Sequence, residues 1–566
     1  MTETRPAAAL PAPQGSIGTE AHAFPGAHTL LTLRVHFEAA IGDPAQYAKS
    51  LWWRLLRKRL RARRAVAPIL GSSAHAYELW LARSQYAAAL APKSEGEHGP
   101  VKKIVAIVDT FDGILGLNDS LRSLSDEGVE AIVLCREAAA LGVESCTEAE
   151  SLAAAAEAID WQEQPWLLPM SAGDVLAVGA AQHYRAAAAG DVARVVYADD
   201  DLLKPGGRRV SPHFKPDWNS ELYSHFDYLS GSCIVQATRK ELLAVAWDSD
   251  WRRCLISNVI RESTPLHVHR VLHHRRTRSL PRVPVRPLEV VGNRPPVTVI
   301  VPTRNRVDLL RTCLSGLVAT DYRDLSVIVV DNGSDDPATL AYLHDLDRRR
   351  FEVMRYDGPF NFAAINNHAA KKTQDPLLCL LNNDIEVIEP TWLATMVQQA
   401  MRSDVGAVGA QLLYPDGRTQ HAGVVLGVGG GTGHAHRLSK PSEEGYFWRH
   451  QLPQYVSAVT GACLVVQRDR FLAIGGFDDE NFTVAFNDVD LCMRLNQHGW
   501  QSLYEPRAQL VHHESVSRGW DRDPVGARRF AGELAALKRK WVTDNYVDPY
   551  HHPNLSRFSE RFVVAL

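Results

Sequence analysis

The sequence lacks several features that would point to a class of protein at once. Its eight cysteines are scattered and none forms a CxxC pair, so we expect reduced, buried thiols rather than a disulfide framework or a zinc ribbon. No run approaches eighteen consecutive apolar residues, so we expect no membrane-spanning helix. The start, MTETRPAAALPAPQG, carries an early acid and no apolar core after a basic start, unlike a signal peptide. These absences predict a soluble, cytoplasmic protein.

Neither positive nor negative charge is in large excess. The chain has 62 Lys and Arg against 65 Asp and Glu, a net charge of -3, so a basic surface for nucleic acid is not indicated and we expect no nucleic-acid partner. Hydrophobic residues make up 45% and charged residues 22%, an ordinary globular balance that excludes disorder as the dominant state. At about 150 residues per domain, 566 residues leave room for two to four domains.

Changes in composition divide the chain into five segments. Strand-like runs alternate with helical stretches in two of them, a pattern that indicates α/β domains with mostly parallel sheets. A Pro/Arg-rich stretch separates these two domains and is typical of a linker. The expected segments are 1–95 (a disordered start and an amphipathic helical region), 96–275 (the first α/β domain), 276–296 (the linker), 297–545 (the second α/β domain) and 546–566 (a C-terminal tail).

The helical region contains the stretch LWWRLLRKRLRARR, residues 51–64. Its apolar side chains recur at three-and-four spacing and lie opposite arginines and lysines; they are Leu51, Trp52, Leu55, Leu56 and Leu60. Two interpretations stay open. The helix packs on its own domain with a solvated basic face, or it lies on the surface of an anionic membrane.

Polar residues follow three strands of the second domain, at 303–305, 331–334 and 382–384. The carboxyl ends of parallel strands meet at one edge of a sheet, so we expect these clusters to lie together. Asp331 could accept a hydrogen bond from a base imide or a ribose hydroxyl. Asp384 could hold a divalent cation that bridges a diphosphate, because hard cations prefer oxygen ligands. The pattern predicts a nucleotide site.

Two later motifs add chemistry to this edge. FNDVDLCMRLNQHG places Asn487 and Asp488 at the start of an amphipathic helix, where a carboxylate is oriented and stays ionised, as a general base requires. VHHESVSRG offers His512 and His513, either of which could complete a metal shell or contact phosphate. A lone acid at a strand end is more often a helix cap or turn former. The order of all the elements favours a functional site.

From Val297 to about Trp541 the chain resembles a family 2 glycosyltransferase with the GT-A nucleotide-diphospho-sugar fold. The resemblance is carried by VIVPTRNR, VVDNGSDD, FNFAAINNHAA, LLNNDIEV, TGACLVVQRDRF, GGFDDENF, FNDVDLCMRL and HHESVSRG. Rhamnosyltransferase-like and bacterial surface-polysaccharide enzymes are closest in character. The resemblance implies an inverting, metal-dependent transfer of a sugar from a nucleotide-diphospho-sugar, of dTDP-rhamnose or UDP-hexose type. It also implies that the acceptor is a hydroxyl of a lipid-linked or growing surface glycan.

The same resemblance assigns roles to residues. Asp488 stands at the position of the catalytic base. Asp384 is the main ligand of Mg2+ or Mn2+, because Asn382 replaces the first acid of the family's DxD motif, and His512, with His513 as the fallback, aligns with the late metal histidine. Contacts with the nucleotide-sugar, including the base-binding acid and a residue beside the diphosphate, are implied for Pro302, Thr303, Arg304, Asn305, Asp331, Asn332, Asn367, Asn382 and Asn383.

The first domain shows a thinner resemblance. YADDDLLKPGGRRVSPHFKPDW is similar to the YSDEDK…GRR…P.FKPDW stretch of family 2 enzymes with tandem transferase domains, and WDSDWRRCL resembles their base motif. The first-domain candidates are therefore Asp199, Asp200, Asp201 and Asp248. Its opening strand lacks the P-x-Y/R-N element, and its second strand ends without the base-binding acid. We expect two tandem GT-A domains in the α/β class, preceded by a helical region, with the first domain degenerate: a scaffold, an acceptor-binding half, or a second active site.

Other interpretations are weaker or remain open. GVGGGTG at 427–433 resembles a dinucleotide loop, but Thr432 replaces its last glycine and the run does not follow the first strand, so a flexible loop over the acceptor site is favoured. His434 and His436 could bind zinc, yet no further ligand spacing supports this. The main alternative is a non-catalytic nucleotide-sugar-binding scaffold of a polysaccharide assembly complex. For the enzyme we expect a location at the inner face of the cell membrane, contacted through residues 51–64.

Overall fold

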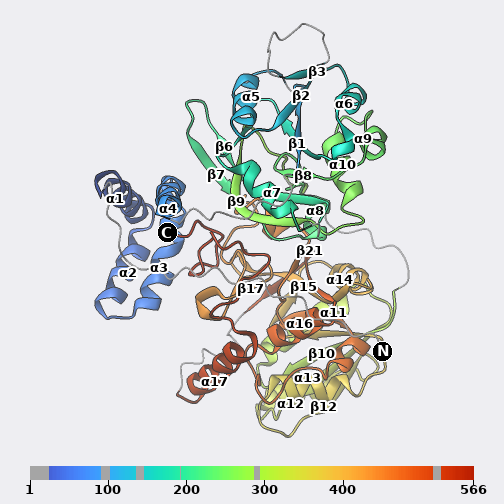
Figure 1. Ribbon diagram of the computed structural model, residues 1–566. Coiled ribbons are helices and arrows are strands. Elements are labelled where there is room, and N and C mark those ends of the chain that lie inside the picture. The colour runs from blue at the N-terminus through green and yellow to red at the C-terminus, as the bar shows by residue number, and fades with distance from the viewer. Residues whose placement is uncertain are drawn as a thin grey trace.

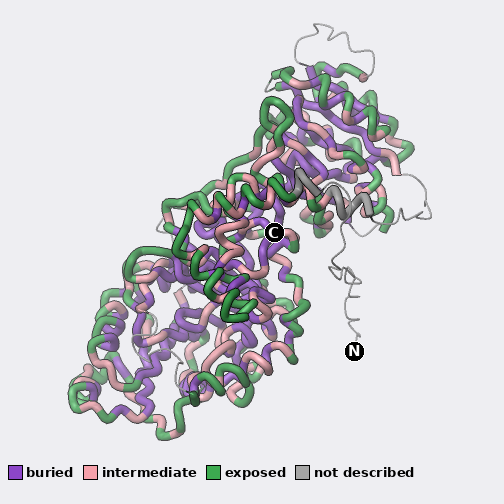
Figure 2. Tube along the Cα trace, turned by 90° about the vertical axis from the view of Figure 1, so that its left-hand side faces the viewer, coloured by how far each residue is buried: buried purple, intermediate pink, exposed green. Residues whose placement is uncertain are grey.

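The computed structural model describes residues 25–90, 102–111, 113–135, 146–190, 193–285, 294–513 and 524–566. Within these ranges two α/β domains lie end to end, and the N-terminal helices form a separate group beside the junction between them (Figure 1). Buried residues run through the interiors of both domains (Figure 2). Residues 1–24 of the expected disordered start lie outside the described residues, as do residues 286–293 of the expected 276–296 linker.

The N-terminal group contains helices α1 (Pro25–Gly42), α2 (Pro44–Leu55), α3 (Arg59–Gly71) and α4 (Ala76–Leu90). Asp43 caps α2, because its carboxylate accepts a hydrogen bond from the backbone N–H of Gln46 at 2.9 Å. The stretch 51–64 is not one helix. It breaks at Arg57, whose φ of 56° is left-handed, so that α2 and α3 pack on each other across a tight turn.

The first domain is built on one sheet. Its strands are β1 (Ile104–Asp109), β2 (Glu130–Leu134), β3 (Thr147–Ala149), β4 (Trp166–Ser171), β5 (Val175–Leu176), β6 (Val195–Leu203), β7 (Arg209–His213), β8 (Cys233–Val235) and β9 (Leu266–Arg275). Its helices are α5 (Leu117–Asp126), α6 (Leu152–Ala158), α7 (Ala180–Ala188), α8 (Ser220–His225), α9 (Arg239–Ala244) and α10 (Trp251–Val259). The strand order is β3-β2-β1-β4-β8-β6-β9-β5, with β7 beside β6.

The second domain repeats this plan. Its main strands are β10 (Val297–Thr303), β11 (Leu325–Asp331), β12 (Phe351–Arg355), β13 (Leu377–Leu381), β14 (Ile385–Val387), β15 (Val405–Leu413), β16 (Thr419–His421), β19 (Gln454–Val456), β20 (Cys463–Gln467) and β21 (Gln501–His512). Its helices are α11 (Val307–Ala319), α12 (Pro337–Asp345), α13 (Phe362–Ala370), α14 (Trp392–Ala400), α15 (Arg468–Ala473), α16 (Asn487–Gln497) and α17 (Pro524–Trp541). The order is β12-β11-β10-β13-β20-β15-β21-β14, with β16 beside β15 and β19 beside β21.

The two sheets therefore share one topology. In each, four consecutive parallel strands are followed by one antiparallel strand, β8 or β20, and then by a parallel pair, β6 with β9 or β15 with β21. The expected α/β class with two tandem GT-A-like domains and an N-terminal helical region is confirmed. The antiparallel strands were not foreseen, because a short apolar run has the same pattern in either direction.

Burial on both faces explains the apolar character of the central strands. All seven residues of β10 are buried, and successive side chains enter two different cores. Val297, Val299 and Val301 pack against α11 and α14, whereas Ile300 packs with residues of α13 and α16 on the opposite face. Helices on both faces of the sheet leave the carboxyl ends of its strands as the place where polar side chains meet.

The C-terminal residues after α17 are not a free tail. His551 and His552 are buried, and the carbonyl of Pro549 accepts a hydrogen bond from the backbone N–H of Asp217, in the first domain, at 2.7 Å. On the other side the Asp548 carboxylate accepts from the backbone N–H of Leu426, in the second domain, at 2.7 Å. This segment, residues 542–566, therefore ties the two domains together.

Residues 542–566 also contact the glycine-rich run at 427–433, for which the sequence predicts a flexible loop. Strands β17 (Val424–Leu426) and β18 (Thr432–His434) pair as a hairpin, with a 3-10 turn between them. The backbone N–H of Gly429 donates to the carbonyl of Arg557 at 2.7 Å, and that of His436 donates to Glu560 at 2.9 Å. An apolar cluster that includes Tyr77 of α4, Phe214 and Leu555 covers the hairpin. Residues 427–433 are thus packed on three other parts of the chain.

Three histidines gather where the segment meets the first domain. One ring nitrogen from each of His267, His269 and His552 lies within 4.8 Å of the others. Two carboxylates pair with them: Asp199 contacts His267 and His552 at 3.1 and 2.9 Å, and Asp217 contacts His267 and His269 at 3.1 and 2.8 Å. The two carboxylates and the three imidazoles therefore form one electrostatic cluster at the domain junction.

The proton positions in this cluster favour ion pairing over a metal site. The Nδ1 atom of His552 accepts a hydrogen bond from the backbone N–H of Asn554 at 3.0 Å, so the ring hydrogen lies on Nε2, which is 2.9 Å from a carboxylate oxygen of Asp199. Both nitrogens of His267 face carboxylates. Burial lowers the pKa of His267, but Asp199 and Asp217 outweigh it and the net pKa is raised. The two carboxylates therefore favour the protonated form of the His267 ring.

This pairing predicts a pH-dependent stability. A raised folded-state pKa stabilises the protein fully below the unfolded value, about 6.5, and the contribution is lost as pH rises through the folded pKa. We expect His267→Gln to lower the free energy of unfolding by about 3 kcal/mol at pH 6, because Asp199 and Asp217 lose the buried imidazole they share and keep only His552 and His269. Urea denaturation at pH 6 and pH 9 measures the effect, with exposed His498→Gln as the control. A difference from the parent that does not shrink at pH 9 would contradict this.

Candidate active site

A cavity of about 650 Å³ lies at the carboxyl edge of the second sheet. It brings together residues from three of the strand ends singled out in the sequence and from the start of α16. It is lined by Pro302, Thr303, Arg304, Asn305, Arg306, Asn332, Phe360, Phe362, Ile365, Asn382, Asn383, Asp384, Gln420, His434, Thr460, Gly461, Ala462, Val484, Asn487, Asp488 and His512. The expected convergence is therefore present in the structure.

Asp384 and His512 meet because of strand register. Asp384 lies in the turn between β13 and β14, and the next residue, Ile385, pairs with His512 across the antiparallel β14–β21 ladder. This pairing places Nε2 of His512 3.1 Å from Oδ1 of Asp384. Both side chains are buried at the cavity wall. Nδ1 of His512 lies 2.8 Å from the side-chain oxygen of Gln420.

Asp488 lies elsewhere on the wall of the same cavity, in the first turn of α16. The backbone N–H of Gly461 donates to its Oδ2 at 2.8 Å, and that of Val489 donates to its Oδ1 at 2.8 Å. These two bonds hold the carboxylate in one orientation. Asp488 is half-buried, so it stays accessible from the cavity.

The predicted contacts of the first strand also line the cavity. The side-chain N–H of Asn383 donates to the hydroxyl of Thr303 at 3.0 Å, which fixes two of the strand ends to each other. Asn305 forms a clamp instead: its amide donates to Asp335 at 2.7 Å and accepts from the backbone N–H groups of Asp335 and Asp336 at 3.0 Å. Arg304 is exposed at the cavity rim.

Asp331 and Asn367 lie outside the set of cavity-lining residues. The carboxylate of Asp331 accepts from Arg355 at 2.7 Å and from the backbone N–H of Ser334 at 2.9 Å. Its neighbour Asn332 does line the cavity. The amide of Asn367 is buried and bonds both backbone groups of Phe477 at 2.9 Å. The roles predicted for Asp331 and Asn367 in nucleotide binding stay predictions.

The structure distinguishes the two neighbouring histidines. His513 turns away from the cavity and contacts Glu386 at 2.8 Å, whereas His512 faces Asp384. Sequence reasoning missed Gln420 and Phe362 as cavity residues, and it placed His434 only in a loop. The TQH run of Gln420 carried no recognised motif, so nothing in the sequence pointed to it.

The first domain has a different set of charges at the equivalent edge. Asp174 lies between β4 and β5 as Asp384 lies between β13 and β14. His274 pairs with Val175 across β5–β9, as His512 pairs with Ile385, but it turns to Asp201, 2.8 Å away. The cation beside Asp174 is instead the guanidinium of Arg275, at 3.7 Å. A side chain of the protein thus stands at the place of an external cation.

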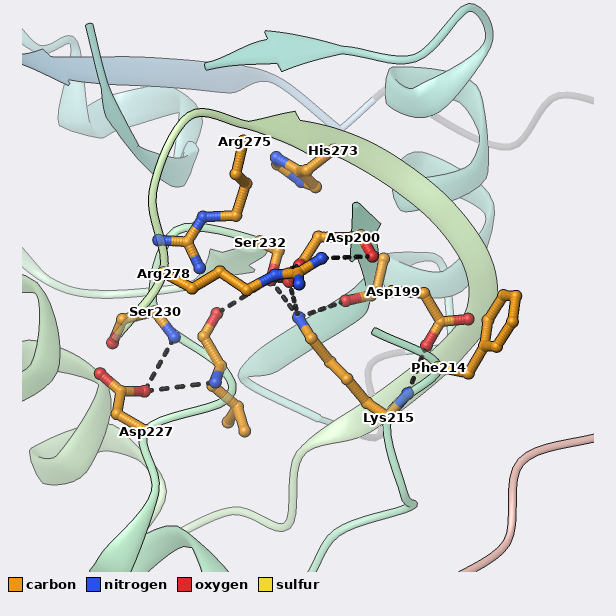
Figure 3. Close-up of polar contacts among 12 residues, drawn as sticks. Asp199, Asp200, Phe214, Lys215, Asp227, Ser230, Ser232, His273, Arg275 and Arg278 are labelled. Atoms are coloured by element: carbon orange, nitrogen blue, oxygen red, sulfur yellow. Dashed lines mark hydrogen bonds and ion pairs between the residues drawn. The ribbon is translucent and has the colours of Figure 1, made fainter. Parts of the chain in front are cut away.

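The three candidate acids of β6 are buried and each has a cation of the protein as its partner. Lys215 and Arg278 converge on Asp200 in Figure 3, with the Lys215 nitrogen 2.8 Å from the carboxylate. Burial raises the pKa of Asp200, but Arg278 and Lys215 outweigh it and hold the pKa well below its usual range. Asp201 pairs with Arg209 at 2.6 Å, and Asp199 with the histidines described above.

Asp248, the candidate base of the first domain, is fully exposed. It precedes α10, and its carboxylate accepts from the backbone N–H of Asp250 at 2.8 Å. The resemblance to the base motif therefore places it on the surface, away from the buried acids of β6. No role of Asp199, Asp200, Asp201 or Asp248 follows from these positions, and each stays a prediction.

The donor set of the second-domain cavity fits a divalent metal. A buried carboxylate oxygen of Asp384 and the Nε2 atom of His512 lie 3.1 Å apart on one wall, a separation that two ligands of the same ion adopt. Oxygen and imidazole ligands suit Mn2+ and, with phosphate oxygens, Mg2+. Asn382 and Asn383 add amide groups beside them.

The charge pairing of the first domain predicts a large stability effect. We expect Lys215→Met to lower the free energy of unfolding by about 3–5 kcal/mol, because it removes a cation from a fully buried carboxylate. The double variant Lys215→Met/Asp200→Asn should recover part of this loss. Urea denaturation measures both, and Lys204→Met, at an exposed lysine, is the control. An effect no larger than that of Lys204→Met would refute the assignment.

Comparisons with known proteins agree with the cavity. Residues 298–454 match the family model of glycosyl transferase family 2. The chain is 37% identical over 66% of its length to the uncharacterized protein y4gI of Sinorhizobium fredii, and 35% identical over 64% of its length to the O-antigen biosynthesis protein RfbC of Myxococcus xanthus. It covers 46% and 31% of these two proteins, less than half of either.

Two further comparisons give shorter matches. An N-acetylglucosaminyl-diphospho-decaprenol L-rhamnosyltransferase of Mycobacterium tuberculosis is 27% identical over 38% of the chain and 75% of its own length. A solved mannosyltransferase from Pyrobaculum calidifontis, in complex with GDP-Man and Mn2+, is 21% identical over 47% of the chain and 71% of its own, with a TM-score of 0.34. The family model, the curated relatives and the motifs at the cavity together identify the second domain as a glycosyltransferase family 2 domain.

Proposed function

We propose that the chain transfers a sugar from a nucleotide-diphospho-sugar to a hydroxyl of a glycan or lipid-linked glycan, with inversion at the anomeric carbon. One observation carries the proposal: Asp384 with His512, and Asp488, line the same cavity. The first pair suits a diphosphate with its cation, and the oriented carboxylate suits an acceptor hydroxyl. A cavity of about 650 Å³ is large enough to hold a nucleotide-sugar.

The chemical step follows from the position of Asp488. Its carboxylate takes the proton of the acceptor hydroxyl while that oxygen forms a bond to the anomeric carbon. The bond from the anomeric carbon to the diphosphate oxygen breaks on the opposite face, and its electron pair leaves with the nucleoside diphosphate. Because attack and departure occur on opposite faces, the configuration inverts. The N–H groups of Gly461 and Val489 hold the carboxylate in place.

The opposite wall would bind the leaving group. Arg304 and Arg306 supply positive charge at the rim, and the hydroxyl of Thr303 and the amide of Asn383 supply hydrogen bonds. Asp384 and His512 would hold Mg2+ or Mn2+, which when bound offsets negative charge on the diphosphate. We assign the predicted DxD role to Asp384 alone, since Asn382 and Asn383 carry no charge.

The class of donor and acceptor is inferred from the relatives. One is named for O-antigen biosynthesis and another for rhamnosyl transfer to a diphospho-decaprenol acceptor. Their names support a dTDP-rhamnose or UDP-hexose donor and a lipid-linked or surface-glycan acceptor for this chain. Phe360 and Phe362 give the cavity an aromatic wall, which suits the apolar face of a sugar ring.

For the first domain we propose a scaffold role. A second transferase would need acids available to a cation, but Asp174 has Arg275 beside it and Asp200 has Lys215 and Arg278. The bifunctional alternative therefore has less support than a single active site. A wholly non-catalytic scaffold is the second alternative, and the presence of Asp384, His512 and Asp488 together disfavours it.

We also propose that the N-terminal helices contact the anionic surface of the cell membrane at its inner face. Trp52 is 59% and Leu55 78% exposed, and Leu33 and Phe37 of α1 are also exposed apolar residues. Basic residues of α2, α3 and the turn between them are exposed as well: Arg54, Arg57, Lys58, Arg59 and Arg61. Arg63 and Arg64 instead contact Phe558 and the carbonyl of Gly429. Exposed apolar and basic side chains on the same helices suit the headgroup region of anionic lipids. No helix among the described residues is long and apolar enough to cross a bilayer.

Release of nucleoside diphosphate tests the catalytic proposal. With a panel of UDP-, dTDP- and GDP-sugars and Mn2+ or Mg2+, we expect one donor to be turned over. Asp488→Asn should lower kcat by a hundredfold or more, because it removes the proton acceptor. Asp384→Ala should lower turnover by a similar factor and weaken donor binding, because the diphosphate loses its cation.

First-domain Asp248→Asn separates the alternatives in the same assay. Unchanged turnover in this variant supports a single active site, whereas a loss equal to that of Asp488→Asn would support two. Turnover that survives both Asp384→Ala and Asp488→Asn would refute the assignment to the second domain. Tight donor binding without turnover, in the presence of a glycan acceptor extract, would favour the non-catalytic scaffold.

Vesicle flotation tests the membrane proposal. We expect the parent to float with vesicles of phosphatidylglycerol and phosphatidylethanolamine and to stay at the bottom with phosphatidylcholine alone. The double variant Trp52→Glu/Leu55→Glu should lose at least 80% of the floated protein. Trp247→Glu is the matched control, because Trp247 is 95% exposed on the first domain. A parent that fails to float, or a double variant that floats fully, would contradict a membrane contact.

A further inference from the structure

We propose that Gln420 is a positioning residue that holds His512 in the tautomer and orientation needed to bind the metal. The inference rests on the proposed function, since it assigns a task within the same cavity. Gln420 belongs to none of the family motifs recognised in the sequence. The contact between the two side chains, the backbone at Gln420 and the comparison with the first domain support the inference separately.

The first argument is the count of hydrogens. The side-chain oxygen of Gln420 lies 2.8 Å from Nδ1 of His512, and an amide oxygen can only accept. Nδ1 therefore carries a hydrogen. In the neutral ring the lone pair then lies on Nε2, which is 3.1 Å from Asp384 and 3.4 Å from the amide nitrogen of Asn382. Gln420 thus directs the metal-binding nitrogen of His512 to Asp384.

The second argument is the backbone at Gln420. In the β15–β16 ladder Leu412 pairs with His421 and Leu413 pairs with Thr419, so Gln420 is the extra residue of a β-bulge. A bulge redirects the side chain of the extra residue, which otherwise would follow the alternation of the strand. Gln420 is buried and lines the cavity, two strands away from His512. The bulge provides the geometry that lets a residue of β16 reach the end of β21.

The third argument is the first domain, which has the same hairpin without the amide. The turns Lys204–Arg208 and Tyr414–Arg418 have the same backbone hydrogen bonds. After the first-domain turn Leu203 pairs with Arg209 and Leu202 with Val210 without interruption, whereas the second domain inserts Gln420 between the partners of Leu413 and Leu412. The register shift of the first domain lies farther along, between Asp200 and Leu202, so that domain has no extra residue at the position of Gln420. In that domain the cation beside Asp174 is Arg275 rather than an imidazole or a metal. The acceptor amide of Gln420 is therefore present in the second domain, where His512 faces Asp384. It is missing in the first domain, where Arg275 lies beside Asp174.

A fixed ring matters because imidazole can bind through either nitrogen. Partners that hold the second nitrogen of a metal-binding histidine typically change metal affinity by about 10–100-fold when they are removed. Loss of the Gln420 oxygen would leave Nδ1 of His512 without its buried acceptor, and the ring would rotate or shift its hydrogen. Either change moves the Nε2 lone pair away from Asp384. The effect is on metal binding itself and does not depend on the sugar.

The test is a titration of the full chain with Mn2+ alone. Electron paramagnetic resonance measures the concentration of free Mn2+ and so gives the affinity. We expect Gln420→Leu to weaken Mn2+ affinity by about 10–100-fold. Gln420→Glu keeps an acceptor oxygen at the same reach and should bind within about threefold of the parent. If Gln420→Leu does not fold, Gln420→Asn keeps a buried amide but withdraws its oxygen by one methylene, and it should also weaken binding.

Gln411→Leu is the matched control, because Gln411 is an equally buried glutamine of β15 whose oxygen accepts from Gln509 at 2.8 Å. It should lower the Tm while Mn2+ affinity stays within about threefold. Asp384→Ala separates the two proposals. If it abolishes Mn2+ binding and the folded Gln420 variants bind like the parent, the role of Gln420 is overturned and the metal site stands. If Asp384→Ala also binds like the parent, the metal site itself is overturned and the role of Gln420 with it.

Discussion

A buried carboxylate needs a cation, and the structure of this chain depends on how each of its two sheets supplies one. Removing the charge from water costs several kcal/mol, which only an opposite charge and hydrogen bonds can offset. In the first domain the cations are side chains of the protein: Lys215 and Arg278 for Asp200, and Arg275 for Asp174. In the second domain the group beside Asp384 is the imidazole of His512. The same topology therefore yields ion pairs with lysine and arginine in one domain and an acid beside a histidine at a cavity wall in the other.

This difference follows from a few substitutions at strand ends, because the sheets themselves are alike. The turn after β4 and the turn after β13 each place an aspartate at the edge of the sheet, and the last long strand passes beside it in both domains. His274 and His512 pair at the same place in their ladders, yet one faces Asp201 and the other Asp384. Function thus lies in the side chains at this edge and not in the strand order.

Much of the fold and the site could be predicted from the sequence, because apolar strands and their polar ends are local patterns. Asp384, Asp488 and His512 follow recognisable runs, and all three line the cavity. Non-local pairing could not be predicted: whether β8 and β20 run antiparallel, or that Asp174 occupies the position of Asp384, depends on contacts far apart in the chain. The break at Arg57 was also missed, since helical spacing of leucines continues across the turn.

The first domain has a structural task that does not require chemistry. Asp199 binds His552, and Asp217 donates its backbone N–H to Pro549, so the first domain provides one side of the groove that holds residues 542–566. The other side of that segment bonds the β17–β18 hairpin through Leu426 and Gly429. The hairpin carries His434 into the wall of the second-domain cavity. Asp199, a buried charge of the first sheet, therefore also helps to position the hairpin that lines this cavity, through the segment of residues 542–566.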